Sequence, residues 1–215
     1  MEAMYQRQSE LDLRVPEDAT VIGVGGVGAW VAIFLAMSGT KNLVLIDPDE
    51  VELSNLNRIP VPPYQVGNHK VDALASLIRA MRPDINIVAV RGRWESHNAP
   101  YYSGVIFDCT DRFSVQLEIS IAHRNRVRVG YDGGFDITVT DAPPPRWGNQ
   151  EDTNYEVTPT WVVGAAMAGL LAVAKVCKWP STNLSFNMAD LMEGRFGYVR
   201  QQEEVVQHVE ASVGN

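Results

Sequence analysis

Cysteine is scarce in this chain, which has only two cysteines, Cys109 and Cys177, in 215 residues. Two thiols cannot build the several disulfides that hold small secreted domains together, and they cannot supply a four-cysteine zinc site. We therefore expect no zinc. Chains without a disulfide framework commonly occur in reducing compartments, so we expect the protein to be cytoplasmic.

Positive charge and long apolar runs are also in short supply. Eighteen Lys and Arg residues face 26 Asp and Glu residues, which gives a net charge of -8. Nucleic acids favour proteins with clustered Lys and Arg, so we expect no nucleic-acid partner. The longest apolar stretch, from Trp161 to Ala174, is shorter than the roughly 20 residues that a membrane-spanning helix needs. The amino terminus lacks the apolar run of a signal peptide, so we expect no membrane partner either.

Short β-rich segments alternate with segments of helical spacing through the first half of the chain. We expect strands at 19–24, 42–46, 86–90 and 105–107, and helices at 27–38, 67–81 and 113–123. Alternation of this kind is typical of βαβ units. The sequence therefore predicts an α/β, Rossmann-like fold with a mainly parallel sheet and helices on both faces.

The pattern changes after residue 126, where antiparallel strands are expected toward the C-terminus. Two β segments flank the Gly133-Gly134 turn, and a long polar loop over 141–158 precedes an apolar helix at 160–178. The chain length suits a single domain over 1–198. We expect a helical arm at 1–18, a Rossmann-like core at 19–178 and a terminal hairpin at 179–200. A tail follows at 201–215.

A glycine-rich loop is the strongest local signal. Gly23, Gly25, Gly26 and Gly28 lie in the run GVGGVG between the first expected strand and the first expected helix. Such glycines permit a tight turn and let backbone N–H groups approach a phosphate at the helix N-terminus. Asp47 ends the second strand, where a carboxylate can accept hydrogen bonds from a ribose. The loop by itself does not distinguish a dinucleotide from ATP.

The polar segment after Asp47 favours ATP. It carries Asn55, Arg58 and Lys70, an amide and two cations that suit the gathering of a triphosphate, although each cation alone could be an ordinary surface charge. Asp111 follows the strand at 105–107, at the edge of the sheet where ligands of α/β proteins bind. A carboxylate there suits Mg²⁺, and the alternative is a cap for the following helix.

These motifs together resemble the ThiF/MoeB/HesA family of ubiquitin-activating-type adenylyltransferases. The resemblance runs from residue 4 to residue 178 and includes MYQRQ, GVGGVG, SNLNR, GNHKV, DCTD and the small-residue helix, at 4–8, 23–28, 54–58, 67–71, 108–111 and 158–176. The chain departs from the family's usual pattern at Ile59, Arg112 and Gln116, where glutamine, asparagine and arginine are usual.

The resemblance implies roles for individual residues. Asp47 would bind the ribose, with Asp49 also in the nucleotide site, and Asp111 would hold Mg²⁺. The phosphates would be contacted by Asn55, Arg58 and Lys70. Of these, Arg58 and Lys70 would also be catalytic. Arg7 would act as an arginine finger supplied by the other subunit of a homodimer.

The implied activity is ATP- and Mg²⁺-dependent adenylation of the C-terminal carboxylate of a small ubiquitin-like or sulfur-carrier protein, or of a peptide. Residues 128–160 contain no cysteine, so we expect no thioester on the enzyme itself. Two alternatives stay open: a family member acting on a small molecule or tRNA, and a non-catalytic binding subunit paired with an active paralogue. A nicotinamide dehydrogenase would leave SNLNR and CTD without a use.

Overall fold

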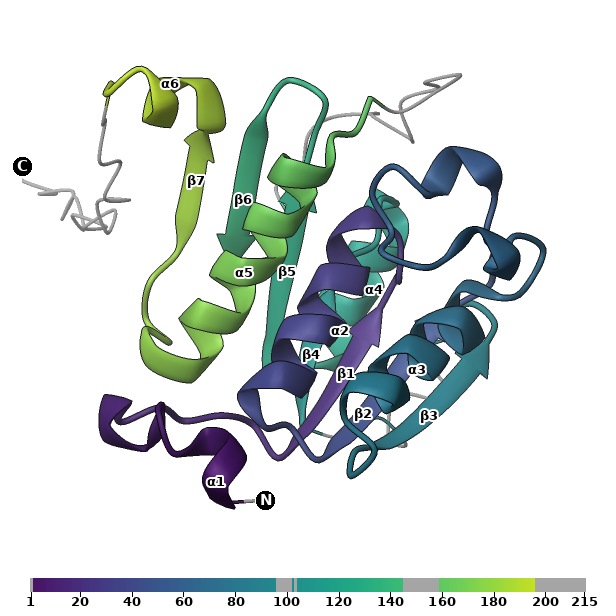
Figure 1. The fold of residues 1–215 in the computed structure, drawn as a ribbon. Coiled ribbons are helices and arrows are strands. Elements are labelled where there is room, and N and C mark those ends of the chain that lie inside the picture. Colours follow the sequence, from purple (N-terminus) through teal and green to yellow (C-terminus); the bar gives the residue numbers. More distant parts are fainter. Residues whose placement is uncertain (1, 96–101, 103, 145–158, 196–215) are drawn as a thin grey trace, which may run out of the picture.

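Seven strands form one sheet in the computed structural model, which describes residues 2–95, 102, 104–144 and 159–195 (Figure 1). The spatial order is β3-β2-β1-β4-β5-β6-β7. The strands are β1 (Asp18–Ile22), β2 (Asn42–Asp47), β3 (Asn86–Arg91), β4 (Val105–Asp108), β5 (Arg126–Tyr131), β6 (Asp136–Thr140) and β7 (Leu184–Asn187). Strands β1 to β5 are parallel to one another, while β6 and β7 are antiparallel additions, so the predicted α/β class and its antiparallel C-terminal part are confirmed.

Helices cover both faces of the sheet. The helices α2, α3 and α5 lie on one face and α4 lies on the other (Figure 1). They span Gly26–Ser38, Lys70–Met81, Val162–Lys178 and Phe113–Ala122 respectively. Alternate residues of β1 separate the two layers, because Val21 packs with the first group of helices and Ile22 packs with Ile119 of α4. Burial on both faces explains why the central strands are continuously apolar in sequence.

Small residues allow α5 to pack closely against α2. A Cβ atom added to Gly169 would lie 3.0 Å from both the Trp30 Cβ atom and the Val31 backbone nitrogen. Ala165 and Ala168 on the same helix are fully buried. The late small-residue segment of the sequence is therefore explained by the close approach of two helix backbones.

Several boundaries differ from the sequence expectations by one or two residues, and the start of the third helix differs most. The third helix begins at Lys70 rather than at residue 67, because a 3-10 turn at Pro63–Gln65 comes first and the Lys70 N–H donates to the Asp49 carbonyl at 2.9 Å. In the turn between β5 and β6, the positive φ of 70° falls on Phe135 and not on a glycine. The Asp132 carboxylate accepts hydrogen bonds from the N–H groups on either side of that residue.

The end of the described chain extends the main sheet. Strand β7 pairs with β6 and is followed by a short helix, α6 (Met188–Met192). The second strand of the expected terminal hairpin lies, apart from its start, outside the described residues, as do the tail at 201–215 and most of the polar loop. In the part of the chain that the structure describes, no helix is long and apolar enough to cross a membrane.

The N-terminal arm lies at the C-terminal end of α2 (Figure 1). It consists of α1 (Glu2–Tyr5) and a 3-10 turn at Ser9–Leu11. The Gln8 side-chain amide donates to the Ser38 carbonyl at 2.7 Å, and the Arg82 guanidinium lies 4.9 Å from the centre of the Tyr5 ring. These contacts hold the arm near the edge of the sheet where the parallel strands begin.

Candidate nucleotide-binding site

The glycine loop joins β1 to α2, and the surroundings of its glycines differ from one position to the next. Gly23 has a φ of +81°, and a Cβ atom there would lie 2.9 Å from the Cys109 carbonyl oxygen. A Cβ atom on Gly28 would lie only 1.8 Å from the Gly23 carbonyl oxygen. Among the residues that the structure describes, leaving aside its two chain neighbours, nothing lies within 4 Å of a Cβ atom added to Gly25. Close packing therefore requires the first and last glycines, and open space faces Gly25.

The N-terminus of α2 offers unpaired backbone donors at this open space. Gly25 is the N-cap residue and has no side chain to cap the helix. The first hydrogen bond of the helix runs from the Ala29 N–H to the Gly25 carbonyl at 3.0 Å. The N–H groups of residues 26–28 precede that ladder and carry the positive end of the helix dipole. The arrangement suits a phosphate group.

Arg58 lies over this helix terminus. The Cδ atom of its side chain would be 3.2 Å from a Cβ atom added to Gly26. The Arg58 guanidinium donates to the Ser54 carbonyl at 2.7 Å, and the Arg58 carbonyl accepts from the Trp30 indole at 3.1 Å. The segment after β2 thus folds back over α2 and brings the Arg58 side chain to the glycine loop, and its predicted contact with a phosphate stays a prediction.

Asp47 ties the end of β2 to the glycine loop. One carboxylate oxygen accepts from the Val24 N–H at 2.8 Å and the other accepts from the Asp49 N–H at 2.9 Å. Only 5% of the residue is exposed, and this burial raises the pKa of the carboxyl group although Lys70 lowers it. A carboxylate has about four acceptor positions, so capacity remains for ribose hydroxyl groups.

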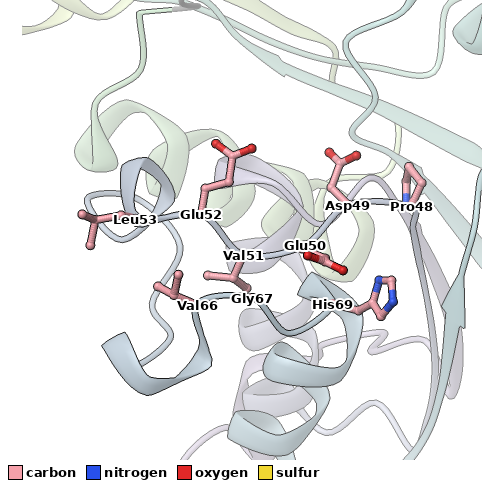
Figure 2. Close-up of a pocket in the computed structure, with 9 residues that line it drawn as sticks. All are labelled: Pro48, Asp49, Glu50, Val51, Glu52, Leu53, Val66, Gly67 and His69. Atoms are coloured by element: carbon pink, nitrogen blue, oxygen red, sulfur yellow. The ribbon is translucent and has the colours of Figure 1, made fainter.

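Lys70 starts α3 and forms an ion pair with Asp49, at a distance of 2.8 Å between the ammonium nitrogen and the carboxylate oxygen. Asp49 of this pair also lines a hollow of about 660 Å³, together with Glu50 and Glu52. Figure 2 shows that Asp49 and Glu52 point the same way from the segment after β2. A triphosphate would meet fewer repulsive charges near Lys70 than over this acidic hollow.

Asn55 and Ile59 are both buried. The Asn55 side-chain oxygen accepts from the Glu52 N–H at 3.2 Å inside the 3-10 turn at Leu53–Asn55, so this amide organises its own turn. Its predicted contact with a phosphate stays a prediction. Ile59, with 2% exposure, packs into the main core. Ile59, which replaces the family's usual glutamine, therefore packs the segment that carries Arg58 against the core.

Asp111 lies just beyond β4 at the edge that also holds the glycine loop, and its side chain is exposed. No cluster of three or more His, Cys, Asp or Glu side chains that could hold a metal ion is found in residues 2–95, 102, 104–144 and 159–195. Mg²⁺ is commonly held by one or two carboxylates together with substrate phosphates, which a single exposed carboxylate fits. A metal cage built from protein groups alone is not present among those residues.

The structure does not bring Arg7 to this site within one chain. Arg7 belongs to the arm at the C-terminal end of α2, while the glycine loop is at the N-terminal end. A helix of 13 residues separates the two by about 20 Å at 1.5 Å per residue. An Arg7 contact with the phosphates would therefore have to come from a second copy of the chain.

Comparison with known proteins adds to this geometry. The sequence model of the ThiF family matches residues 13–205. The chain belongs to the ThiF family. Ubiquitin-like modifier-activating enzyme 5 of Culex quinquefasciatus is 33% identical over 121 residues, which are 49% of this chain and 30% of that protein. Its Bombyx mori counterpart is 46% identical over 69 residues, 32% of this chain and 18% of that protein. This ThiF-family chain thus matches less than a third of either relative's length.

Solved structures show the same fold. Escherichia coli MccB superposes with a TM-score of 0.64 at 17% identity, covering 80% of this chain and 64% of that one. The E. coli tRNA N6-threonylcarbamoyladenosine dehydratase TcdA gives a TM-score of 0.63 at 21% identity, covering 81% of this chain and 92% of that one. The Rossmann-like arrangement of this ThiF-family chain is therefore shared with both proteins.

Both thiols lie in surroundings that disfavour the thiolate. Cys109 follows β4 directly, and burial together with the charge of Asp108 raises the pKa of its thiol. Burial raises the pKa of Cys177, near the end of α5, to about 11. A reactive nucleophilic cysteine needs a lowered pKa, so neither side chain has the surroundings of one.

Proposed function

We propose that this ThiF-family chain is an ATP- and Mg²⁺-dependent adenylyltransferase that activates a C-terminal carboxylate as an acyl adenylate. The observation that carries the proposal is the open space at Gly25, which faces the free N–H groups of α2 under the Arg58 side chain. Asp47, tied to the same loop, supplies acceptors for a ribose. Phosphate donors and ribose acceptors thus meet at one edge of the sheet.

The proposed reaction needs little covalent chemistry from the protein. An oxygen of the partner's carboxylate forms a bond to the α-phosphorus of ATP, and the bond from that phosphorus to the pyrophosphate oxygen breaks. Because the carboxylate is already anionic, no general base is needed. The helix N–H groups, Arg58 and Lys70 align the phosphates and stabilise their charge, and this stabilisation is commonly the largest catalytic contribution. Mg²⁺ held at Asp111 would neutralise further phosphate charge.

The partner in this proposal is a small ubiquitin-like or sulfur-carrier protein, or a peptide. Support comes from the relatives named as ubiquitin-like modifier-activating enzymes and from the MccB structures solved with MccA. Both thiols have raised pKa values, so we propose that the activated carboxylate is passed on without a thioester on this chain. Nucleic acid and membranes have no part in this reaction.

We propose a homodimer in which Arg7 of one chain reaches the phosphates of the other. The arm borders an apolar groove of about 490 Å³ between α2 and α5, which includes the exposed side chains of Leu11, Met37 and Trp179. A second copy would cover these side chains. Mixing an Arg7→Ala chain with an Arg58→Ala chain should restore up to about a quarter of the activity, because one mixed site keeps both arginines. No recovery would exclude the exchange of Arg7 between subunits.

The adenylation step is tested by ATP–pyrophosphate exchange with a candidate carrier that ends in glycine. The Arg58→Ala and Asp111→Ala chains should each lose about 100-fold or more of the exchange rate, as is common when a group that stabilises transition-state charge is removed. Arg124→Ala, an exposed arginine after α4, is the matched control and should exchange normally. Undiminished exchange by either site variant would refute the proposed site.

The same assay separates the alternatives. If the pure protein does not bind ATP, the result favours the hypothesis that it is a non-catalytic subunit. If it binds ATP but exchanges pyrophosphate only with a small molecule or with tRNA, the adenylation site stands and the partner assignment is wrong.

A further inference from the structure

The loop that carries Asp111 is held by two side chains that the sequence motifs do not assign to ATP. Asp108 is the last residue of β4 and is only 1% exposed. Its Oδ1 atom accepts from the Thr110 N–H at 3.1 Å and from the Thr110 hydroxyl at 2.7 Å. This side chain therefore fixes both the backbone and the side chain of the residue before Asp111.

Gln116 holds the same residue through its carbonyl group. It lies in the first turn of α4, and its side-chain amide donates to the Thr110 carbonyl at 2.6 Å. One residue earlier, the Cys109 N–H donates to the Ile22 carbonyl of β1 at 2.9 Å. Three hydrogen bonds at Thr110, made by two side chains, and one at the Cys109 N–H thus anchor the segment, while Asp111 is exposed.

We infer that Asp108, Thr110 and Gln116 form a clamp that positions the Asp111 carboxylate for Mg-ATP. The inference rests on the proposed function, because the metal role of Asp111 is part of that proposal. An exposed carboxylate on a free loop would lose conformational entropy on binding the metal, whereas the clamp fixes the backbone of the residue just before Asp111. Gln116, which stands where the family usually has arginine, is then a positioning residue that acts through the backbone.

Nucleotide binding measured by calorimetry tests the clamp without relying on catalysis. Gln116→Met keeps the side-chain length and removes the donor, and Thr110→Val keeps the shape and removes the hydroxyl. Each should weaken Mg-ATP binding about tenfold, as is typical for groups that orient a metal ligand, and leave ATP binding in EDTA within about twofold of the parent chain. Thr110→Ser should restore the parent affinity. Glu118→Gln, at an exposed position of α4, is the control.

A double-substitution cycle separates this inference from the proposed function. In an Asp111→Ala background, Gln116→Met should have no further effect on Mg-ATP affinity, because the carboxylate that it positions is gone. Equal losses with and without Asp111 would overturn the clamp. If Asp111→Ala by itself leaves Mg-ATP affinity unchanged, the metal role fails and the clamp fails with it. If Asp111→Ala weakens binding and the clamp variants do not, only the clamp is wrong.

Discussion

Two glycines in one loop provide a sharp test of the site, because alanine at each should fail in a different way. A Cβ atom on Gly28 would lie 1.8 Å from the Gly23 carbonyl oxygen, and real Cβ contacts are essentially never shorter than 3.0 Å. The backbone of the loop or helix would therefore have to move by about 1.2 Å, the difference between those two distances. Both contacting atoms are fixed to the backbone, so no side-chain rotation relieves the clash.

The expected cost of Gly28→Ala can be estimated from two opposing effects. Overpacking of this kind destabilises by about 1–3 kcal/mol and occasionally more. Alanine gains about 1 kcal/mol over glycine inside a helix, which offsets part of that cost. With a backbone clash at the upper end of the range, we expect a net loss of about 2 kcal/mol, which lowers Tm by about 4–8 °C in a chain of this size.

Gly25→Ala should give the opposite result. Its φ of -71° is ordinary for alanine, and no described residue beyond its two chain neighbours lies within 4 Å of the new methyl group, so stability should stay within about 0.5 kcal/mol. The methyl group would occupy the space that a phosphate needs, and the loss of one or two charged hydrogen bonds should weaken ATP binding by about 10- to 100-fold.

Thermal unfolding and ATP titration of both variants provide the measurement. Gly130→Ala, an open glycine in β5, is the control and should change neither quantity by much. Parent-like ATP affinity in the Gly25→Ala chain would show that phosphates do not approach there. Parent-like Tm in the Gly28→Ala chain would refute the close packing of the loop against α2.

Two further predictions concern buried ionisable groups. Burial raises the Asp108 pKa more than the neighbouring Arg128 lowers it, so the folded state disfavours the charge. Asp108→Asn should therefore raise the free energy of unfolding. This gain should be absent below the unfolded pKa of about 3.8, grow as pH rises toward the folded pKa, and stay constant above it. Denaturant unfolding between about pH 5 and pH 8 measures the gain, and a gain that falls with rising pH would refute the reasoning. With a pKa of about 11, only about 0.1% of Cys177 is thiolate near pH 8. A thiol reagent should modify it at least 100-fold more slowly in the folded chain than in denaturant, and equal rates would contradict its burial.

Several parts of the fold could be predicted from the sequence because their signals are local. The β-rich run before the glycine loop and the apolar spacing after it place β1 and α2 within a residue or two. Lys70 shows where local signals end. Helical spacing continues back to residue 67, but a hydrogen bond from the Lys70 N–H to the Asp49 carbonyl, a contact between distant residues, determines where the helix begins.

The turn between β5 and β6 shows a second limit. The left-handed conformation in this turn belongs to Phe135, although two consecutive glycines precede it. Gly133 is needed for another reason, since a Cβ atom there would lie 2.5 Å from the Pro159 Cβ atom. Composition alone cannot distinguish a glycine required by φ from a glycine required by a close neighbour.

The sequence by itself determined the family, the alternation of strands and helices, and the residue types that suit a nucleotide. Those properties follow from short-range periodicity and from motifs whose chemistry is carried by residue identity. Only the tertiary structure decided that Gly25 faces open space while Gly28 is closed off, and that the arm with Arg7 lies at the opposite end of α2 from the loop. It also decided that Gln116 contacts Thr110. Those facts depend on which distant backbones approach one another, and no local pattern encodes that approach.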